Sequence, residues 1–405
     1  MEQNSRNIGQ DRLRLIYGDK VLWVILAILS IISVLLVFSS TAKMAYDVTD
    51  SRSSVNFLVM QLGYLIASVV IVVLLHRLSV RVYKKISWII WGAFVALTIF
   101  TLIFGASTNG AARWLSIGFI RIQPSEFLKV ATVLHLTAML TRGKTQIKNL
   151  RLFPSMSRTA SKAQNRKILL GNTLTIVMPI YLSVGAILIA HTSSAVLVFI
   201  VSILILYIAG VKFREIFKLV ALAALVGALF TMLGMGRSGT ASNRVETWFE
   251  TWGSDRTEIR VDDISDTERS MIAIQNGGLL GRGAGQSAMR VEMIHPESDY
   301  AFAFFVEEYG LILSMLLLLL YIWIFFRAMW IYERCRDPFR ELLVLSLATL
   351  ILIQALLHVM VSVNFLPETG QVLPLVSRGG SALFCTYMVF MLMLSISVKN
   401  DQDEK

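Results

Sequence analysis

The sequence predicts an all-α, polytopic integral membrane protein with about ten transmembrane helices, and three observations support this fold class. Hydrophobic residues make up 55% of the 405 residues and charged residues only 16%, whereas a soluble protein carries about 25% charged residues. The mean hydropathy is +0.65. The apolar residues also occur in blocks about 20 residues long, the length that a helix needs to cross roughly 30 Å of hydrocarbon. The short alternating segments of a transmembrane barrel are not found.

Ten apolar blocks are the predicted membrane spans. In chain order, their approximate bounds are 21–40, 56–76, 87–105, 122–141, 170–190, 193–210, 217–235, 301–326, 342–365 and 378–398. Most connections between the blocks are short, so we expect one compact helical bundle. The chain is therefore predicted to form a single membrane domain over residues 1–405, with cytoplasmic tails at 1–20 and 399–405.

The net charge of +11 is explained by membrane topology. Lys and Arg gather in the segments that are cytoplasmic if the N-terminus is inside: eight lie in 142–167 and four in 77–85. This distribution matches the positive-inside rule. Membrane lipids with anionic headgroups are expected partners of such basic segments, and no nucleic acid is expected.

Two connections are much longer than the others. Residues 142–169 form a predicted basic cytoplasmic loop, and residues 236–298 form a predicted extracytoplasmic loop. A loop of the second size is usually functional or disordered. Its Trp248, Phe249 and Trp252 argue against plain disorder, although they also suit anchoring at the membrane interface.

Cysteine and histidine patterns exclude several classes of site. The two cysteines, Cys335 and Cys385, exclude a disulfide framework and have no metal-ligand spacing. The five histidines are scattered, and neither an HExxH nor a GxSxG motif is present. The chain therefore lacks the catalytic motifs of a zinc peptidase and of a serine hydrolase. No organic cofactor is expected.

The first polar group at the membrane lies in ARWLSIGFIRIQPSEFLK, residues 112–129. Pro124 suits the first turn of a helix, and Glu126 and Lys129 share one helix face and can form an ion pair. One interpretation is a self-neutralising pair that lets the helix enter the membrane. The other adds Arg113 and Gln123 to make a partly cationic pocket for an anionic headgroup.

The second group lies in HPESDYAFAFFVEEYG, residues 295–310. Carboxylates in a membrane span are functional candidates by default. Asp299 stands at the entrance of the predicted helix, where it is a candidate catalytic acid or a simple helix cap. Glu307 lies roughly 12 Å further along the axis, too far for a close carboxylate dyad. Glu307 and Glu308 are expected to pair with other helices and support the bundle.

Two further segments are candidates for anion binding. The segment NGGLLGRGAGQS, residues 276–287, is rich in glycine, so successive N–H groups beside Arg282 can bind an anion. Mere flexibility of the loop is an equally good interpretation. In LPLVSRGGSALF, residues 373–384, Ser377 and Ser381 flank the predicted start of the last helix, which also suits an anion. Arg378 there can instead extend to the membrane interface.

These four segments resemble, in order, the motifs of the SEDS family (shape, elongation, division and sporulation). The resembling stretches are ARWLSIGFIRIQPSEFLK, AIQNGGLLGRGAGQS, HPESDYAFAFFVEEYG and LPLVSRGGSALF. Each motif alone is weak, whereas the ordered set together with about ten spans is highly specific and covers essentially the whole chain. The glycine-rich wording is closer to the division members than to the elongation members.

The resemblance implies a peptidoglycan glycosyltransferase of the bacterial cytoplasmic membrane. Such an enzyme polymerises lipid II, an undecaprenyl-pyrophosphate-linked disaccharide peptide, into glycan strands at the outer membrane face. It works with a class B penicillin-binding protein, which supplies the crosslinking transpeptidase, and with other division or elongation proteins. A lipid II flippase and a non-catalytic scaffold that recruits a synthase are the alternatives.

The resemblance also assigns roles to residues. Asp299 is the expected catalytic carboxylate, acting directly or through a divalent cation, Mg²⁺ or Mn²⁺. Arg113 and Lys129 are expected to orient the site and to offset the pyrophosphate charge. The remaining candidates for substrate contact or orientation are Gln123, Glu126, Arg282, Ser377 and Ser381.

Two departures from the family pattern are visible. The last motif usually has Tyr or Met where this chain has Arg378. The sixth span often begins with an Asp-Leu-Gly-Thr segment, where this chain reads HTSSAV from His191. This chain therefore has neither an aromatic side chain at the first of these positions nor an aspartate at the second.

Overall fold

Helices make up most of the described chain, which confirms the predicted class of all-α membrane protein. The computed structural model describes residues 17–40, 54–108, 111–117, 120–142, 150–154, 162–232, 244–246, 248–249, 264–293 and 297–398. The helical segments are α2 (Lys20–Ser40), α3 (Ser54–Leu75), α4 (Val80–Phe104), α5 (Pro124–Leu140), α6 (Lys162–Ile168), the π-helical η3 (Leu169–Val177), α7 (Met178–Ala190), α8 (Thr192–Ile208), α9 (Phe213–Met232), α11 (Asp266–Gly277), α12 (Met289–Glu292), α13 (Ala301–Arg334), α14 (Pro338–Ser362) and α15 (Gly380–Ser397).

A helix lies at the place of each predicted span, and α4 and α13 extend beyond the predicted bounds. Within the described residues, seven helical segments are long and apolar enough to cross a membrane, and α8 is a shorter apolar helix. The helix α5 has 17 residues and contains a buried ion pair, while the first turn of α9 contains Arg214 and Glu215. Length and composition therefore do not mark these two as spans, and the number of ten stays a prediction.

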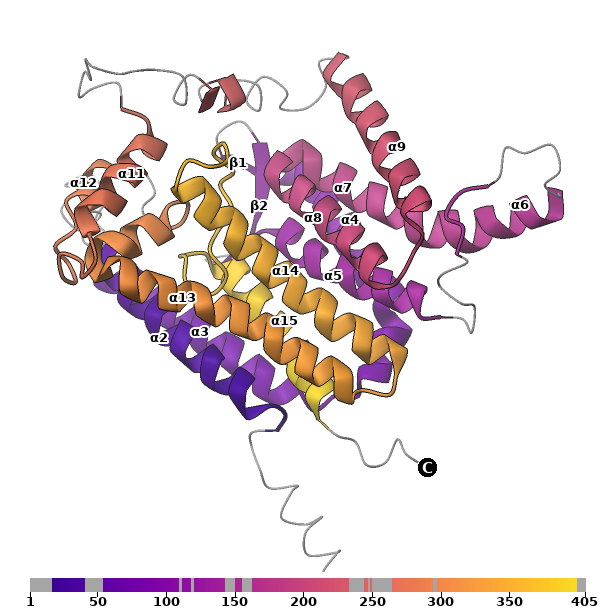
Figure 1. Ribbon diagram of the computed structural model, residues 1–405, viewed down its shortest axis with the longest axis horizontal. Coiled ribbons are helices and arrows are strands. Elements are labelled where there is room, and N and C mark those ends of the chain that lie inside the picture. Colours follow the sequence, from indigo (N-terminus) through magenta and orange to yellow (C-terminus); the bar gives the residue numbers. More distant parts are fainter. Residues whose placement is uncertain are drawn as a thin grey trace, which may run out of the picture.

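The centre of the bundle is formed by α5, α14 and α15, whose residues are mostly buried. Along the bundle, α13 packs against α14, and α2 and α3 pack against α13 and α15 respectively (Figure 1). The outward faces of α3 and α4 expose large apolar side chains such as Ile66, Leu74 and Trp88. An apolar outer surface is expected where lipid is the solvent, because hydrocarbon does not solvate polar or charged side chains.

A small sheet, which the sequence analysis did not expect, connects α4 to α5. Its strands β1 (Ala106–Thr108), β2 (Ala111–Ile117) and β3 (Ile120–Ile122) pair antiparallel in that order. The register sets Ala106 opposite Trp114 and Leu115 opposite Ile122. Because Pro124 then starts α5, the sheet and the helix bring the ARW and QPSE motifs to one place.

Part of the predicted 236–298 loop is folded against the bundle. Ser265 and Glu268 form a capping box at the start of α11, and α11 packs on α13 beside α12 (Figure 1). The Trp248 indole donates a hydrogen bond to the Asn364 carbonyl at 3.1 Å. Trp252 lies outside the described residues, as do residues 143–149 and 155–161 of loop 142–169 and the tails 1–16 and 399–405.

Candidate functional site

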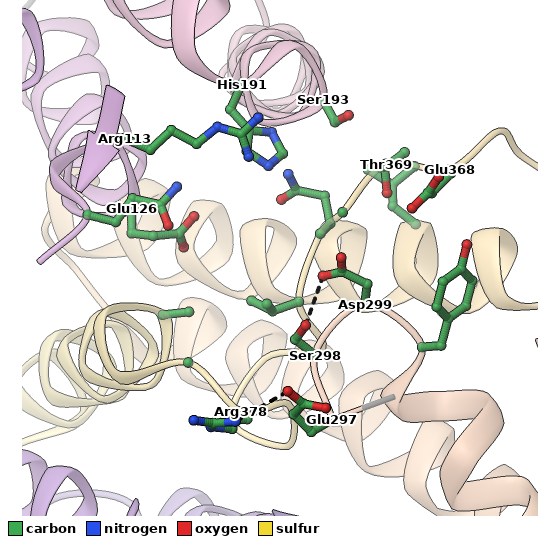
Figure 2. Close-up of a pocket in the computed structure, with 18 of the residues that line it drawn as sticks. Arg113, Glu126, His191, Ser193, Glu297, Ser298, Asp299, Glu368, Thr369 and Arg378 are labelled. Atoms are coloured by element: carbon green, nitrogen blue, oxygen red, sulfur yellow. Dashed lines mark hydrogen bonds and ion pairs between the residues drawn. The ribbon is translucent and has the colours of Figure 1, made fainter. Parts of the chain in front are cut away.

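A cavity of about 1000 Å³ lies where the sheet, the N-terminal ends of α5 and α8, the turn before α13 and the segment between α14 and α15 meet (Figure 2). Apolar side chains such as Met60, Val196 and Leu357 line part of its wall. The charged and histidine side chains that line it are Arg113, Arg121, Glu126, His191, Arg244, Asp266, Glu297, Asp299, Glu368 and Arg378. The lining therefore combines an apolar wall with cations and carboxylates, as expected for a site that binds an amphipathic anion.

Asp299 is half-buried in the turn that precedes α13, as the sequence analysis expected. The Ser298 hydroxyl donates a hydrogen bond to Asp299 Oδ1 at 3.1 Å. The turn is also connected to the bundle through His358, which accepts a hydrogen bond from the Phe302 N–H at 3.2 Å and contacts the Gln371 carbonyl at 2.7 Å. The Ser298 hydroxyl thus contacts the carboxylate directly, and His358 holds the first turn of α13, which follows it.

His191 faces Asp299 across Gly370. A Cβ atom on Gly370 would lie 3.8 Å from His191 Nε2 and 3.9 Å from Asp299 Oδ2. The His191 Nδ1 accepts a hydrogen bond from the Ser194 N–H at 3.4 Å, so the Nε2 carries the proton in the neutral ring. Burial, with the charges of Lys129 and Arg244, lowers the pKa of His191 to about 4. The imidazole is therefore a neutral hydrogen-bond donor at pH 7.

Glu126 and Lys129 form the ion pair that their spacing predicts. Lys129 Nζ lies 2.8 Å from Glu126 Oε2, and both side chains are buried. Glu126 lines the cavity, whereas Lys129 lies one turn deeper and does not line it. Lys129 thus contacts Glu126 rather than the cavity itself, and its orienting role stays a prediction.

Arg113 and Gln123 both line the cavity. Arg113 extends from β2 and points across the cavity toward His191 (Figure 2). Its Nε atom is buried and has no hydrogen-bond partner within the part of the chain that the structure describes. A buried donor without a partner is costly, so this guanidinium is suited to an acceptor brought by a ligand. The Gln123 side chain donates to Ser125 Oγ at 3.2 Å.

Ser377 and Ser381 do not line the cavity but join chain segments around it. The Ser377 hydroxyl donates to the Ser298 carbonyl at 2.9 Å and accepts from the Leu373 N–H at 2.8 Å. The Ser381 hydroxyl accepts from the Gln123 N–H at 2.9 Å. These contacts satisfy the two hydroxyls inside the protein, so an orienting role fits both better than direct substrate contact.

Arg282 and the glycine-rich stretch lie away from the cavity, against α13. Arg282 Nη1 is 4.0 Å from Glu307 Oε1, and the N–H groups of Arg282 and Gly283 donate to the carbonyls of Glu307 and Glu308 at 2.9 Å. These N–H groups are already used, which argues against the anion-binding interpretation. The structure does not bring Arg282 to the other candidate residues.

Glu307 and Glu308 are fully buried below the turn, and both accept hydrogen bonds. Glu307 accepts from the Ala288 N–H at 3.1 Å and from the Ser287 hydroxyl. Glu308 accepts from the Gly285 N–H at 2.9 Å and from Ser39 of α2. This geometry agrees with the structural role that their spacing predicted, although most partners come from the loop rather than from other helices.

The sequence profile of the FtsW/RodA/SpoVE family of cell cycle proteins matches residues 19–402. The chain belongs to this family. It is 25% identical over 388 residues to "Probable peptidoglycan glycosyltransferase FtsW" of Buchnera aphidicola subsp. Acyrthosiphon pisum, covering 94% of this chain and 89% of that protein. It is 26% identical over 393 residues to "Peptidoglycan glycosyltransferase MrdB" of Escherichia coli K12, covering 94% of each.

The fold is also shared with a solved structure reported as "Structural coordination of polymerization and crosslinking by a peptidoglycan synthase complex". The TM-score is 0.67 at 20% sequence identity, and the match covers 95% of this chain and 99% of that one. The family match therefore extends over all four motifs and over the helices that carry them.

Several cavity residues of this family member were not singled out by the sequence analysis. His191, Arg244 and Glu368 stand outside the four motifs, and only the fold brings them to the same cavity as Asp299. Arg121 lies within the first motif, but nothing in its spacing distinguished it from its neighbours. The one sequence signal for His191 was its place at the start of a predicted apolar helix, where a polar side chain is a candidate for a functional role. Arg244 and Glu368 lie in connections, where charged residues are common and carry no signal.

Proposed function

We propose that this chain is a peptidoglycan glycosyltransferase that polymerises lipid II into glycan strands. Membership of the FtsW/RodA/SpoVE family and the names of the two relatives support this activity. The observation that carries the proposal is the Asp299 carboxylate in a large, arginine-lined cavity. A disaccharide with a pyrophosphate and a lipid chain needs a site of this size with cations, a carboxylate and an apolar wall.

Polymerisation joins the 4-hydroxyl of one sugar to the anomeric carbon of another and expels a lipid pyrophosphate. The acceptor hydroxyl loses its proton, and the leaving pyrophosphate carries away the electron pair of the broken bond. In our scheme Asp299 takes the proton as general base. Arg113, whose Nε has no partner among the described residues, stabilises the negative charge on the leaving group. Lys129, held by Glu126, adds a positive charge that helps to offset the charge of the pyrophosphate.

A divalent cation, Mg²⁺ or Mn²⁺, is an optional addition to this scheme. Within the described residues, no group of three or more His, Cys, Asp or Glu side chains is placed to hold a metal ion. Mg²⁺ is often held by one or two carboxylates with substrate phosphates and waters, and Asp299 is the residue that would hold it here. When bound, the ion would neutralise charge on the pyrophosphate.

We propose the outer face of the bacterial cytoplasmic membrane as the location of the cavity, since lipid-linked sugars are polymerised on that side. The basic 142–167 and 77–85 segments support this orientation through the positive-inside rule. As partner we propose a class B penicillin-binding protein, supported by the shared fold with a member of a peptidoglycan synthase complex. The sequence of the glycine-rich segment, which is closer to that of the division members of the family, supports a role in cell division.

The proposal is tested by lipid II polymerisation with the purified chain and its partner transpeptidase. Asp299→Asn keeps the size of the side chain but removes the base, so we expect the rate to fall by about 10²–10⁴-fold. Asp337→Asn is the matched control, because Asp337 precedes α14 and its side chain does not cap that helix. It should polymerise at the parent rate.

The opposite outcome is equally clear. If Asp299→Asn folds, binds its partner and makes glycan strands at the parent rate, Asp299 is not the catalytic base. Translocation of lipid II across vesicles without any polymerisation by the parent protein would instead support the flippase. Full glycan synthesis by the partner alone would support the scaffold.

A further inference from the structure

The turn that carries Asp299 is held by Ser377 and Arg378, which lie just before Gly379, the N-cap residue of α15. The Arg378 N–H donates to the Glu297 carbonyl at 2.8 Å, and the Arg378 guanidinium pairs with the Glu297 carboxylate at 3.2 Å. The Ser377 hydroxyl donates to the Ser298 carbonyl at 2.9 Å. These bonds fix the backbone of the two residues immediately before Asp299, and Figure 2 shows the side-chain pair of Arg378 and Glu297.

The ion pair between Glu297 and Arg378 is the side-chain part of this connection. Glu297 is buried, with 4% of its surface exposed, whereas Arg378 lines the cavity and is partly exposed. Removing the cation would leave a buried carboxylate without its charged partner, which is strongly unfavourable. We therefore expect the turn to rearrange when either member of the pair loses its charge.

The connection is anchored on the α15 side by close packing. A Cβ atom on Gly380 would lie 2.9 Å from the Tyr64 ring of α3, so the first residue of α15 is pressed against that helix. The Ser377 hydroxyl also accepts from the Leu373 N–H. The start of α15 is thus a rigid base from which Arg378 reaches the turn.

We propose that Glu297 and Arg378 are a positioning pair that orients the Asp299 carboxylate toward the reacting sugar. The inference rests on the proposed function of Asp299 and adds two positioning residues to it. Arg378 does not serve as the main cation for the pyrophosphate, because its guanidinium is engaged by Glu297. That task remains with Arg113 on the opposite wall of the cavity (Figure 2).

A misplaced catalytic group mainly lowers the rate of the chemical step, since a shift of about 1 Å can cost ~100-fold. The pair should therefore act on kcat while KM changes little. Two residues that act through one contact are also non-additive: once the pair is broken, removing the second charge costs little more.

The test is a double-mutant cycle of lipid II polymerisation with Glu297→Gln, Arg378→Gln and the double variant. We expect each single variant to lower kcat about tenfold or more, with KM within about twofold, and the double variant to match the slower single variant. The exchange Glu297→Arg with Arg378→Glu should recover part of the lost rate. Asp19→Asn and Arg327→Gln are matched controls, because they break another buried acid–arginine pair that does not line the cavity.

Two results would overturn the inference. Losses that multiply in the double variant would show that the residues act separately. Glu297→Gln at the parent rate, together with a raised KM for Arg378→Gln, would make Arg378 a substrate ligand instead. If Arg378→Gln does not fold, the cycle is repeated with Arg378→Lys and Glu297→Asp, which keep the charges but alter the reach.

Failure of the inference is distinguishable from failure of the proposed function. If Asp299→Asn polymerises at the parent rate, the function assigned to Asp299 is wrong whatever the pair does. If Asp299→Asn is inactive while Glu297→Gln and Arg378→Gln work at the parent rate, only the positioning pair is wrong.

Discussion

Asp299 and His191 come from distant parts of the chain and lie on either side of Gly370. The backbone of Gly370 has a φ of +60°, a conformation that glycine adopts at no steric cost. A Cβ atom there would enter the space between the carboxylate and the imidazole. The cavity therefore brings together a carboxylate that can accept a proton and a neutral ring that can donate a hydrogen bond to a sugar hydroxyl.

The lowered pKa of His191 predicts a pH dependence of stability. Between pH 6.5, its ordinary pKa, and about pH 4, the unfolded chain binds a proton at His191 that the folded chain does not. The free energy of unfolding therefore falls as the pH drops through this window. His191→Gln lacks this contribution, so its melting temperature should fall less than that of the parent between pH 7 and pH 4.

The measurement is thermal unfolding of both purified proteins in detergent across that range. Groups other than His191 titrate in the same way in both proteins, so the difference between the two melting curves isolates the histidine. A difference that stays constant from pH 7 to pH 4 would contradict a buried neutral His191.

At the scale of elements, the glycine-rich stretch packs against α13, which is kinked at this point. Gly310 interrupts the helical backbone of α13 with φ 81° and ψ 169°, and the Leu311 N–H donates to the Gly278 carbonyl at 3.0 Å. Cβ atoms on Gly277, Gly281 and Gly310 would come within 2.4 Å of the backbone across this contact. The glycines are thus needed for close approach of two chain segments, which lets Glu307 and Glu308 accept hydrogen bonds from the loop.

Two glycine substitutions separate close packing from backbone strain. Gly281 and Gly285 both have positive φ values, 82° and 78°, so alanine at either costs about 1 kcal/mol of strain. Only at Gly281 does the new Cβ meet backbone, 2.3 Å from the Glu308 carbonyl, whereas Gly285 has open space.

We expect Gly281→Ala to lower the melting temperature much more than Gly285→Ala, or to prevent folding. Thermal unfolding of the purified variants measures the difference. Equal losses for the two variants would mean that the contact with α13 contributes nothing to stability.

At the scale of the whole molecule, α2 is tied to α13 at both ends. Ser39 near the end of α2 donates to Glu308 below the cavity. Before the start of α2, Asp19 accepts hydrogen bonds from Arg327 Nε at 2.8 and 2.9 Å and pairs with its Nη2. The Asp19 carboxylate is nearly buried. These contacts fix the long α13 against its neighbour over most of its length.

Arg327→Ala should destabilise the bundle by about 3 kcal/mol, because it leaves the buried Asp19 carboxylate without its cation. Arg334→Ala is the control, since Arg334 is exposed and contacts the same Trp330 ring, whereas the ion pair of Asp19 is with Arg327. Thermal unfolding should show a large loss for Arg327→Ala and a small one for Arg334→Ala. Similar losses would assign the stability to the indole contacts instead.

Predictability differed between the elements of the fold. Apolar blocks of about 20 residues predict spans because hydrocarbon demands that length, and a helix lies at each block. The sheet at Ala106–Ile122 was missed because strands this short, next to an apolar span, show no recognisable alternation of apolar and polar residues. The packing role of the glycines was missed because only the kink at Gly310 reveals what they pack against.

By itself the sequence determined the class of protein, the family motifs and the place of Asp299 at a helix entrance. It also determined the Glu126–Lys129 pair, because a spacing of three residues fixes both side chains on one helix face. Only the tertiary structure decided which residues share the cavity. His191, Gly370 and the Glu297–Arg378 pair meet Asp299 through contacts between segments far apart in the chain, and no local pattern records such contacts.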